Sequence, residues 1–98
     1  MDLATARQRA QVLLRGIERP DVPLMLDPHM DPIVRSWCYA FYWNSVRYLD
    51  SGDFLSYVAG NGPVVVPTDG SEPFFLMTYG PPEELLDEFE RHGLPDEG

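Results

Sequence analysis

The sequence predicts an α+β fold, a small antiparallel sheet of about four to five strands with an N-terminal and a C-terminal helix packed on it. Three observations support this prediction. Apolar residues recur at helical spacing near both ends of the chain, and aromatic residues alternate along its middle. The turns between the segments are too short for parallel crossovers. A length of 98 residues indicates a single domain spanning residues 1–98.

The first element is an amphipathic helix, expected at residues 2–18. Its apolar stripe follows spacings of three and four and consists of Leu3, Ala6, Ala10, Leu13, Leu14 and Ile17. Pro20 ends the helix, because the residue before a proline is disfavoured in the helical region. Residues 22–27 read as a short strand, and residues 27–32 carry the Asp and Pro residues of a loop.

The next element is a long aromatic strand, expected at residues 34–44. Five of the twelve aromatic residues of the chain fall within seven positions there. Alternation places four of them on one face of a strand, namely Trp37, Tyr39, Phe41 and Trp43. The opposite face holds small residues such as Cys38 and Ala40, as expected where another layer packs closely. The aromatic face is the largest apolar surface, so we expect both terminal helices to cover it.

The second half of the chain contains more turns. Residues 46–59 include a turn at Ser51-Gly52-Asp53, and residues 54–59 are compatible with a strand or a helical turn. The remaining elements are a tight turn at residues 60–63, a strand at 64–66, an Asp-Gly hairpin turn at 68–71, a return strand at 74–79, a helix from Pro81-Pro82 to Gly93, and a frayed tail at 94–98.

The net charge of −9 argues against two classes of partner. Nucleic acids and anionic membrane surfaces are both bound through clustered cations. The charge is also uneven, since residues 1–19 sum to +2 and residues 83–98 to −6. We expect neither a membrane span nor a signal peptide, because the apolar runs are short and no basic region precedes one. The single cysteine is compatible with a reducing cytoplasm.

Two patterns could carry chemistry. Cys38 with His29 or His92 suggests a thiol hydrolase, but a cysteine inside a regular strand has no helix start to acidify it. Asp27, His29 and Asp31 alternate and could ligate a metal, yet the flanking prolines frame a turn and no clear fourth ligand is present. We therefore expect no enzyme activity, no cofactor and no metal.

Acidic residues crowd the last predicted helix. They are Glu83, Glu84, Asp87, Glu88 and Glu90. Three interpretations are open: a paired-carboxylate acid/base site, a solvated helix face, and a surface that contacts a basic protein. The last is the most informative, because complementary potentials guide charged proteins to each other.

One series of motifs points to a family. It runs Trp37-x-x-x-Phe41-Tyr42-x-Asn44-Ser45, then Tyr48-x-x-Ser51-Gly52-Asp53, then Gly60-Asn61-Gly62-Pro63-Val64-Val65-Val66, then Asp69-Gly70, then Thr78 in a strand and Pro82-Glu83-Glu84. Over residues 20–92 the series resembles the YrhB-like family, also called immunity protein 35. Two departures are Ser51 in place of a threonine, and Pro67 where an acidic residue is expected.

The resemblance implies a small α+β protein of the bacterial cytoplasm that binds another protein. The first hypothesis is an immunity protein that neutralises a cognate toxin by stoichiometric binding. The second is a chaperone-like or accessory protein of a biosynthetic pathway such as peptide maturation, and the third is a small thiol hydrolase that uses Cys38. The partner is expected to present a basic surface. The residues expected to contact it are Glu83, Glu84, Asp87, Glu88, Glu90, Tyr42, Trp43, Asn44 and Tyr48.

Overall fold

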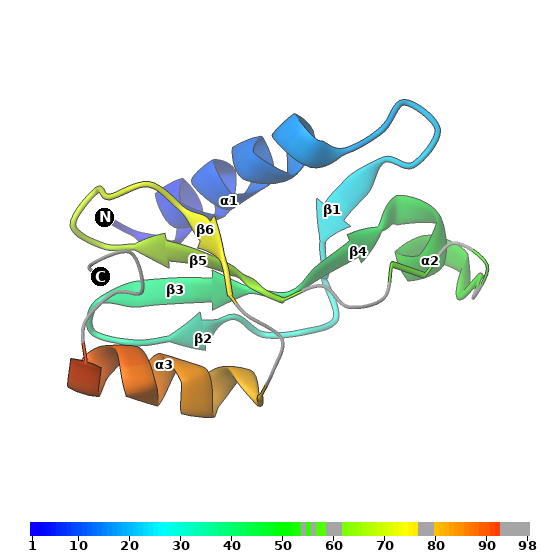
Figure 1. Cartoon of the computed structure of the whole chain (residues 1–98). Coiled ribbons are helices and arrows are strands. Elements are labelled where there is room, and N and C mark those ends of the chain that lie inside the picture. Colours follow the sequence, from blue (N-terminus) through cyan, green and yellow to red (C-terminus); the bar gives the residue numbers. More distant parts are fainter. Residues whose placement is uncertain (54, 56, 59–61, 77–79, 93–98) are drawn as a thin grey trace.

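The computed structural model shows an α+β chain in which an antiparallel sheet lies between the two terminal helices (Figure 1). The structure describes residues 1–53, 55, 57–58, 62–76 and 80–92. The elements in chain order are α1 (Leu3–Ile17), β1 (Leu24–Leu26), β2 (Ile33–Val34), β3 (Cys38–Phe41), β4 (Trp43–Ser45), α2 (Val46–Ser51), β5 (Val64–Pro67), β6 (Phe74–Phe75) and α3 (Pro82–His92).

Helix α1 confirms the prediction for residues 2–18. Asp2 caps its start, because the Asp2 carboxylate accepts a hydrogen bond of 2.8 Å from the backbone N–H of Thr5. This bond also lowers the pKa of Asp2. The centre of the predicted stripe is completely buried and consists of Ala6, Ala10 and Leu14. The two ends of the stripe, Leu3 and Ile17, remain partly exposed.

The strands form two antiparallel sheets, one of four strands in the order β2-β3-β5-β6 and one in which β1 pairs with β4. The prediction of one strand over residues 34–44 is therefore wrong. A tight turn at Ser36 and Trp37 separates β2 from β3, and it is closed by a 2.9 Å hydrogen bond from the Arg35 N–H to the Cys38 carbonyl. The chain then changes sheets at Tyr42, whose carbonyl accepts a hydrogen bond from Asp27 on the β1 side.

The two terminal helices cover opposite faces of the four-stranded sheet, which contradicts the prediction that they share the aromatic face. The cluster under α1 includes Phe41, Trp43, Val64 and Val66. The cluster under α3 contains Cys38, Ala40, Val65, Leu85 and Leu86, with Trp37 packed against it. The small side chains of β3 leave room for the leucines of α3. Trp37 packs on the α3 side of the sheet. It lies in the turn before β3, where the alternation of side chains along a strand does not apply.

The second half of the chain agrees with several local predictions. Strand β5 covers the predicted strand at 64–66, and the Asp-Gly turn is present with Gly70 at a φ of 90°. Hydrogen bonding by the Ser71 side chain and by the Ser71 backbone N–H, which donates to the Asp69 carboxylate at 2.9 Å, lowers the pKa of Asp69. Ser45 caps α2, and Gly52 ends it with a left-handed backbone. Parts of the expected turn at 60–63 and return strand at 74–79, Gly93 and the tail lie outside the described residues.

Candidate protein-binding surface

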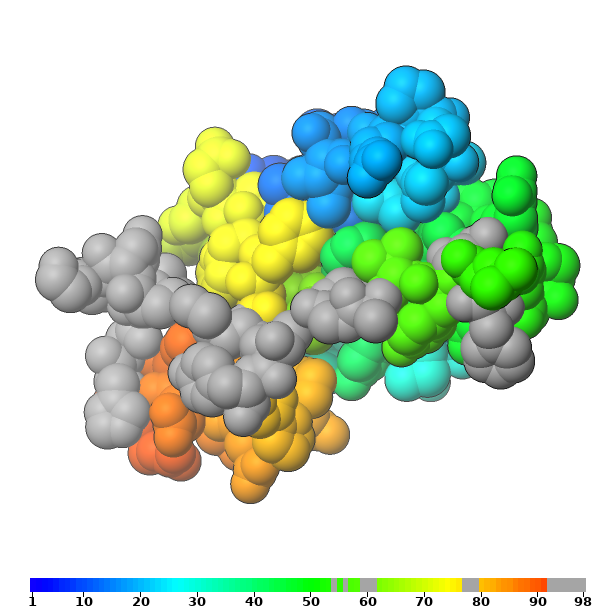
Figure 2. All heavy atoms as spheres, turned by 45° about the vertical axis from the view of Figure 1, so that its right-hand side comes forward, coloured from blue at the N-terminus to red at the C-terminus, as the bar shows by residue number. Residues whose placement is uncertain are grey.

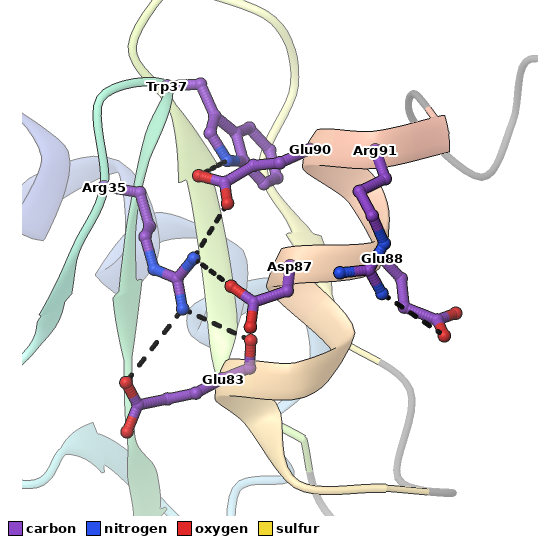
Figure 3. A network of polar contacts seen from close by, with 7 residues as sticks. All are labelled: Arg35, Trp37, Glu83, Asp87, Glu88, Glu90 and Arg91. Carbon is purple, nitrogen blue, oxygen red and sulfur yellow. Dashed lines mark hydrogen bonds and ion pairs between the residues drawn. The ribbon is translucent and has the colours of Figure 1, made fainter.

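The acidic face of α3 is built around one arginine of the β2–β3 turn (Figure 3). Arg35 donates hydrogen bonds to the carboxylates of Asp87 and Glu90, at 2.6 Å and 2.9 Å. Its other terminal nitrogen donates to the backbone carbonyl of Glu83 at 3.2 Å and lies 4.0 Å from the Glu83 carboxylate. The hydrogen bond to Asp87 and the surrounding carboxylates raise the pKa of Arg35. Three of the five predicted acids therefore interact with this one arginine of their own chain.

Trp37 adds a further contact to the same cluster. Its indole N–H donates to the second carboxylate oxygen of Glu90 at 3.1 Å, and its ring packs edge-on against Phe89. Glu90 thus joins the β2–β3 turn to α3 through two different partners. These contacts give Arg35 and Trp37, which the sequence did not link to α3, the role of holding the helix in place.

Two acids of the predicted set are not bonded to Arg35. Glu84 and Glu88 are both exposed, and Glu88 lies 3.9 Å from Arg91 one turn away. An exposed pair at this distance contributes little to stability. Glu84 and Glu88 are therefore the members of the predicted acidic set best placed to meet another protein without disturbing the contacts of Arg35.

Trp43 and Asn44 lie in the interior, contrary to the expectation of a contact surface. They are only 8% and 6% exposed. The Trp43 indole N–H donates to the Gly62 carbonyl at 2.8 Å. The Asn44 side chain pairs with both backbone groups of Val58, accepting from its N–H at 2.8 Å and donating to its carbonyl at 3.3 Å. Both side chains therefore act inside the molecule, where each binds the backbone of a neighbouring segment.

Tyr42 and Tyr48 are both half-buried. Tyr42 lies between β3 and β4, and Tyr48 lies in α2. The Tyr48 ring packs edge-on against Tyr57, with ring centres 4.8 Å apart. Asn44 and Tyr48 thus hold the same segment, because Tyr57 and Val58 are neighbours. The sequence predicted these two residues as contacts but gave no sign that they act together on residues 57–58.

Cys38 does not have the environment of a nucleophile. Its side chain is completely buried in β3, and this desolvation raises its pKa to about 12. A thiol with this pKa is almost entirely protonated at neutral pH, whereas the thiolate is the reactive form. His29 lies in the exposed β1–β2 loop, and the side chain of His92 is outside the described part of the chain.

The predicted Asp27-His29-Asp31 pattern forms a turn. The Asp27 carboxylate accepts a 2.8 Å hydrogen bond from the backbone N–H of His29, which is the local bond that makes aspartate common in turns. Among the described residues, no group of three or more His, Cys, Asp or Glu side chains is arranged to hold a metal ion. No helix in the described residues is long and apolar enough to cross a membrane.

Comparison with known proteins identifies the family. The model of the immunity protein 35 family matches residues 4–91, from the first turn of α1 to the last turn of α3. The chain belongs to this family. It is also similar to the uncharacterized protein YrhB of Escherichia coli strain K12, with 29% identity over 83 residues that cover 81% of this chain and 85% of that protein. No solved structure matches.

Membership confirms the resemblance carried by the aromatic, Gly-Asn-Gly-Pro and valine motifs. The match also includes most of α1, which the motif series over residues 20–92 left out. This agrees with the structure, in which Ala6, Ala10 and Leu14 of α1 complete the cluster beneath β3 and β5.

Proposed function

We propose that this protein is a cytoplasmic immunity protein that neutralises a cognate bacterial toxin by binding it in a one-to-one complex, without catalysis. The observation that carries the proposal is the match to the immunity protein 35 family across residues 4–91. The environment of Cys38 supports the non-catalytic part, because its raised pKa leaves the third hypothesis, a thiol hydrolase, without a nucleophile.

The charge of the protein supports a basic partner. With a net charge of −9, the protein attracts a cationic surface over the range of the Debye length, about 10 Å at 0.1 M salt. Charge complementarity of this kind mainly accelerates association, and apolar and aromatic contacts then supply most of the affinity. Glu84 and Glu88 are exposed acids on α3 that are not bonded to Arg35, and Tyr42 and Tyr48 are the partly exposed aromatic residues of the proposed set.

The direct test uses the gene next to the one that encodes this protein. Its product is expressed in a bacterial host alone and together with this protein. We expect growth arrest in the first case, recovery in the second, and a one-to-one complex on size-exclusion chromatography with light scattering. An unrelated acidic protein of similar size serves as the control for non-specific charge effects.

Two results would contradict the proposal. One is a toxic neighbouring protein that remains toxic and unbound when this protein is present at excess. The other is a neighbouring biosynthetic enzyme or precursor peptide whose processing depends on this protein, which would instead favour the accessory role.

A further inference from the structure

A groove lies beside α2, at the end of the molecule formed by the small β1–β4 sheet; Figure 2 turns this end toward the viewer. It has a volume of about 750 Å³, which is within the range of about 300–1,000 Å³ typical of binding clefts. It is bounded by the link between α1 and β1, by α2, and by residues 55, 57 and 58. The lining residues are Asp21, Val22, Pro23, Ser45, Val46, Arg47, Asp50, Ser51, Leu55, Tyr57 and Val58.

The groove presents apolar side chains to solvent. Leu55 is 97% exposed and Tyr57 is 48% exposed. Val46 and Val58 are each partly exposed and line the same groove. Large apolar side chains gathered around a concave surface mark a site of interaction far more often than single exposed residues do.

The walls of the groove are held by internal contacts. Both backbone groups of Val58 are bonded to the buried Asn44 side chain. Tyr57 rests against the ring of Tyr48. Helix α2 is capped by Ser45, and the Val46 N–H donates to the Pro23 carbonyl at 2.9 Å, which joins α2 to the opposite wall. A surface fixed in this way loses little conformational entropy on binding.

The charges on the groove define its occupant. Asp21 and Asp50 are exposed acids on opposite walls, one before β1 and one in α2. Arg47 also lines the groove, so the charges of its lining residues sum to −1, on a protein whose total is −9. Arg19, outside the lining, lies 4.0 Å from the Asp21 carboxylate in an exposed pair of the kind that contributes little. Such a site favours an apolar side chain flanked by cations: the apolar group contacts Leu55 and Tyr57, and the cations lie near the two carboxylates.

We infer that this groove is the docking site for a segment of the partner protein in which an apolar or aromatic residue is flanked by Lys or Arg. The inference rests on the proposed function only in assuming a protein partner. It assigns the contact to the α2 end of the molecule, whereas Asn44 and Tyr48 act as positioning residues that hold Tyr57 and Val58 in place.

The test titrates the isotope-labelled protein with three capped tripeptides and follows its backbone amide resonances. The probe is Lys-Phe-Lys, and the matched controls are Glu-Phe-Glu and Lys-Gly-Lys. We expect the probe to shift the amides of Val22, Val46 and Tyr57 with a dissociation constant on the order of a millimolar, as for a contact of a few side chains. Each control should bind at least about tenfold more weakly.

Two matched pairs of variants sharpen the test. Asp50→Lys should weaken the binding of Lys-Phe-Lys by about fivefold or more. Asp31→Lys makes the same charge change in the exposed β1–β2 loop, outside the groove, and should leave that binding unchanged. Leu55→Ser should weaken binding, whereas Val34→Ser, at an apolar residue 63% exposed on β2, should not.

Several outcomes would overturn the inference: no shift at the highest peptide concentration, shifts centred on α3, or equal binding of all three peptides. Equal binding of phenylalanine amide alone would point to a small-molecule site and would also refute it. The titration requires no toxin, so it remains decisive even if the immunity role fails. A toxin that is neutralised equally well by the Asp50→Lys and Leu55→Ser variants would refute this docking site while leaving the immunity role intact.

Discussion

Burial of the Cys38 thiol makes the stability of the folded protein decrease at alkaline pH. Burial raises its pKa to about 12, whereas an unfolded cysteine titrates near about 8.5. Below about pH 8.5 both states keep the proton. Between the two pKa values only the folded state keeps it, so the free energy of unfolding falls as pH rises, by about 1.4 kcal/mol per pH unit.

We expect wild-type protein to lose about 2 kcal/mol more free energy of unfolding than Cys38→Ala between about pH 8 and pH 10. Urea unfolding of both proteins at the two pH values measures this difference. The variant should keep its partner binding and lose only about 1 kcal/mol at neutral pH, the cost of a small cavity. Equal pH dependence in the two proteins, or loss of binding in a folded variant, would contradict a buried structural thiol.

Gly62 is required because another backbone segment passes close to it. A Cβ atom at this position would lie 1.9 Å from the carbonyl oxygen of Leu76. The Leu76 N–H in turn donates to the Pro63 carbonyl, which fixes the distance between the two segments. Among the described glycines, positive φ angles occur at Gly52 and Gly70. Gly62 is therefore needed for close packing and not for a left-handed backbone.

Gly62→Ala should lower the free energy of unfolding by about 3 kcal/mol, as expected when overpacking forces the backbone to shift. Gly16→Ala is the matched control, because its Cβ would meet no atom within 4 Å. Alanine in place of glycine there should stabilise α1 by about 0.5 kcal/mol. Thermal unfolding of both variants measures the contrast, and an unchanged melting temperature for Gly62→Ala would refute the close approach.

Helix α3 depends on Arg35 for much of its attachment. The Arg35 side chain is 18% exposed and bonds to Asp87 and Glu90 from across the sheet edge. Arg35→Gln should lower the free energy of unfolding by about 2 kcal/mol, as for the loss of charge-assisted hydrogen bonds. Amide hydrogen exchange should accelerate first in α3. Arg91→Gln removes only the exposed pair with Glu88 and should change stability by less than about 0.5 kcal/mol; similar effects for both variants would rule out the anchoring role.

Local patterns predicted most of the elements. The spacing of apolar residues located α1, the β-branched run located β5, and Pro82 with its following glutamates located the start of α3. The turn between β2 and β3 was missed because Ser36 gives it only a weak turn signal, and the alternating aromatic residues indicated a continuous strand through it.

The arrangement of the layers was harder to predict from local patterns. Three successive valines, all completely buried in β5, are typical of a strand covered on both faces, and this signal outweighs the aromatic alternation that suggested one covered face. The partners of Arg35 lie 52 and 55 residues away along the chain, so no local pattern revealed them. The groove at α2 was missed for the same reason, since its walls come from three separate segments.

The arginines of α1 and the acids of α3 lie on opposite sides of the four-stranded sheet, because the two terminal helices cover opposite faces. Helix α1 carries Arg7, Arg9 and Arg15 on one side of the sheet, and α3 carries its acids on the other. Charge reversal on α3 therefore tests how a basic partner approaches. The double variant Glu84→Lys/Glu88→Lys should reduce the association rate several-fold at low salt, with a smaller effect as salt rises, because screening weakens steering.

The Asp87→Lys variant provides the structural contrast. It places a second cation beside Arg35 and should destabilise the attachment of α3, whereas the double variant should keep the wild-type melting temperature within about 1 °C. Stopped-flow association with the partner and thermal unfolding measure the two effects. An association rate insensitive to both salt and the double variant would show that these acids only solvate the helix.

The edges of the four-stranded sheet set a limit on how this protein can associate. In the described residues, the edge strands β2 and β6 are two residues long each, and the faces between them are covered by α1 and α3. Short edges leave few unpaired backbone groups on which a strand of another chain could grow. The described edges of this sheet therefore offer another chain little backbone to pair with, which discourages polymerisation through the four-stranded sheet.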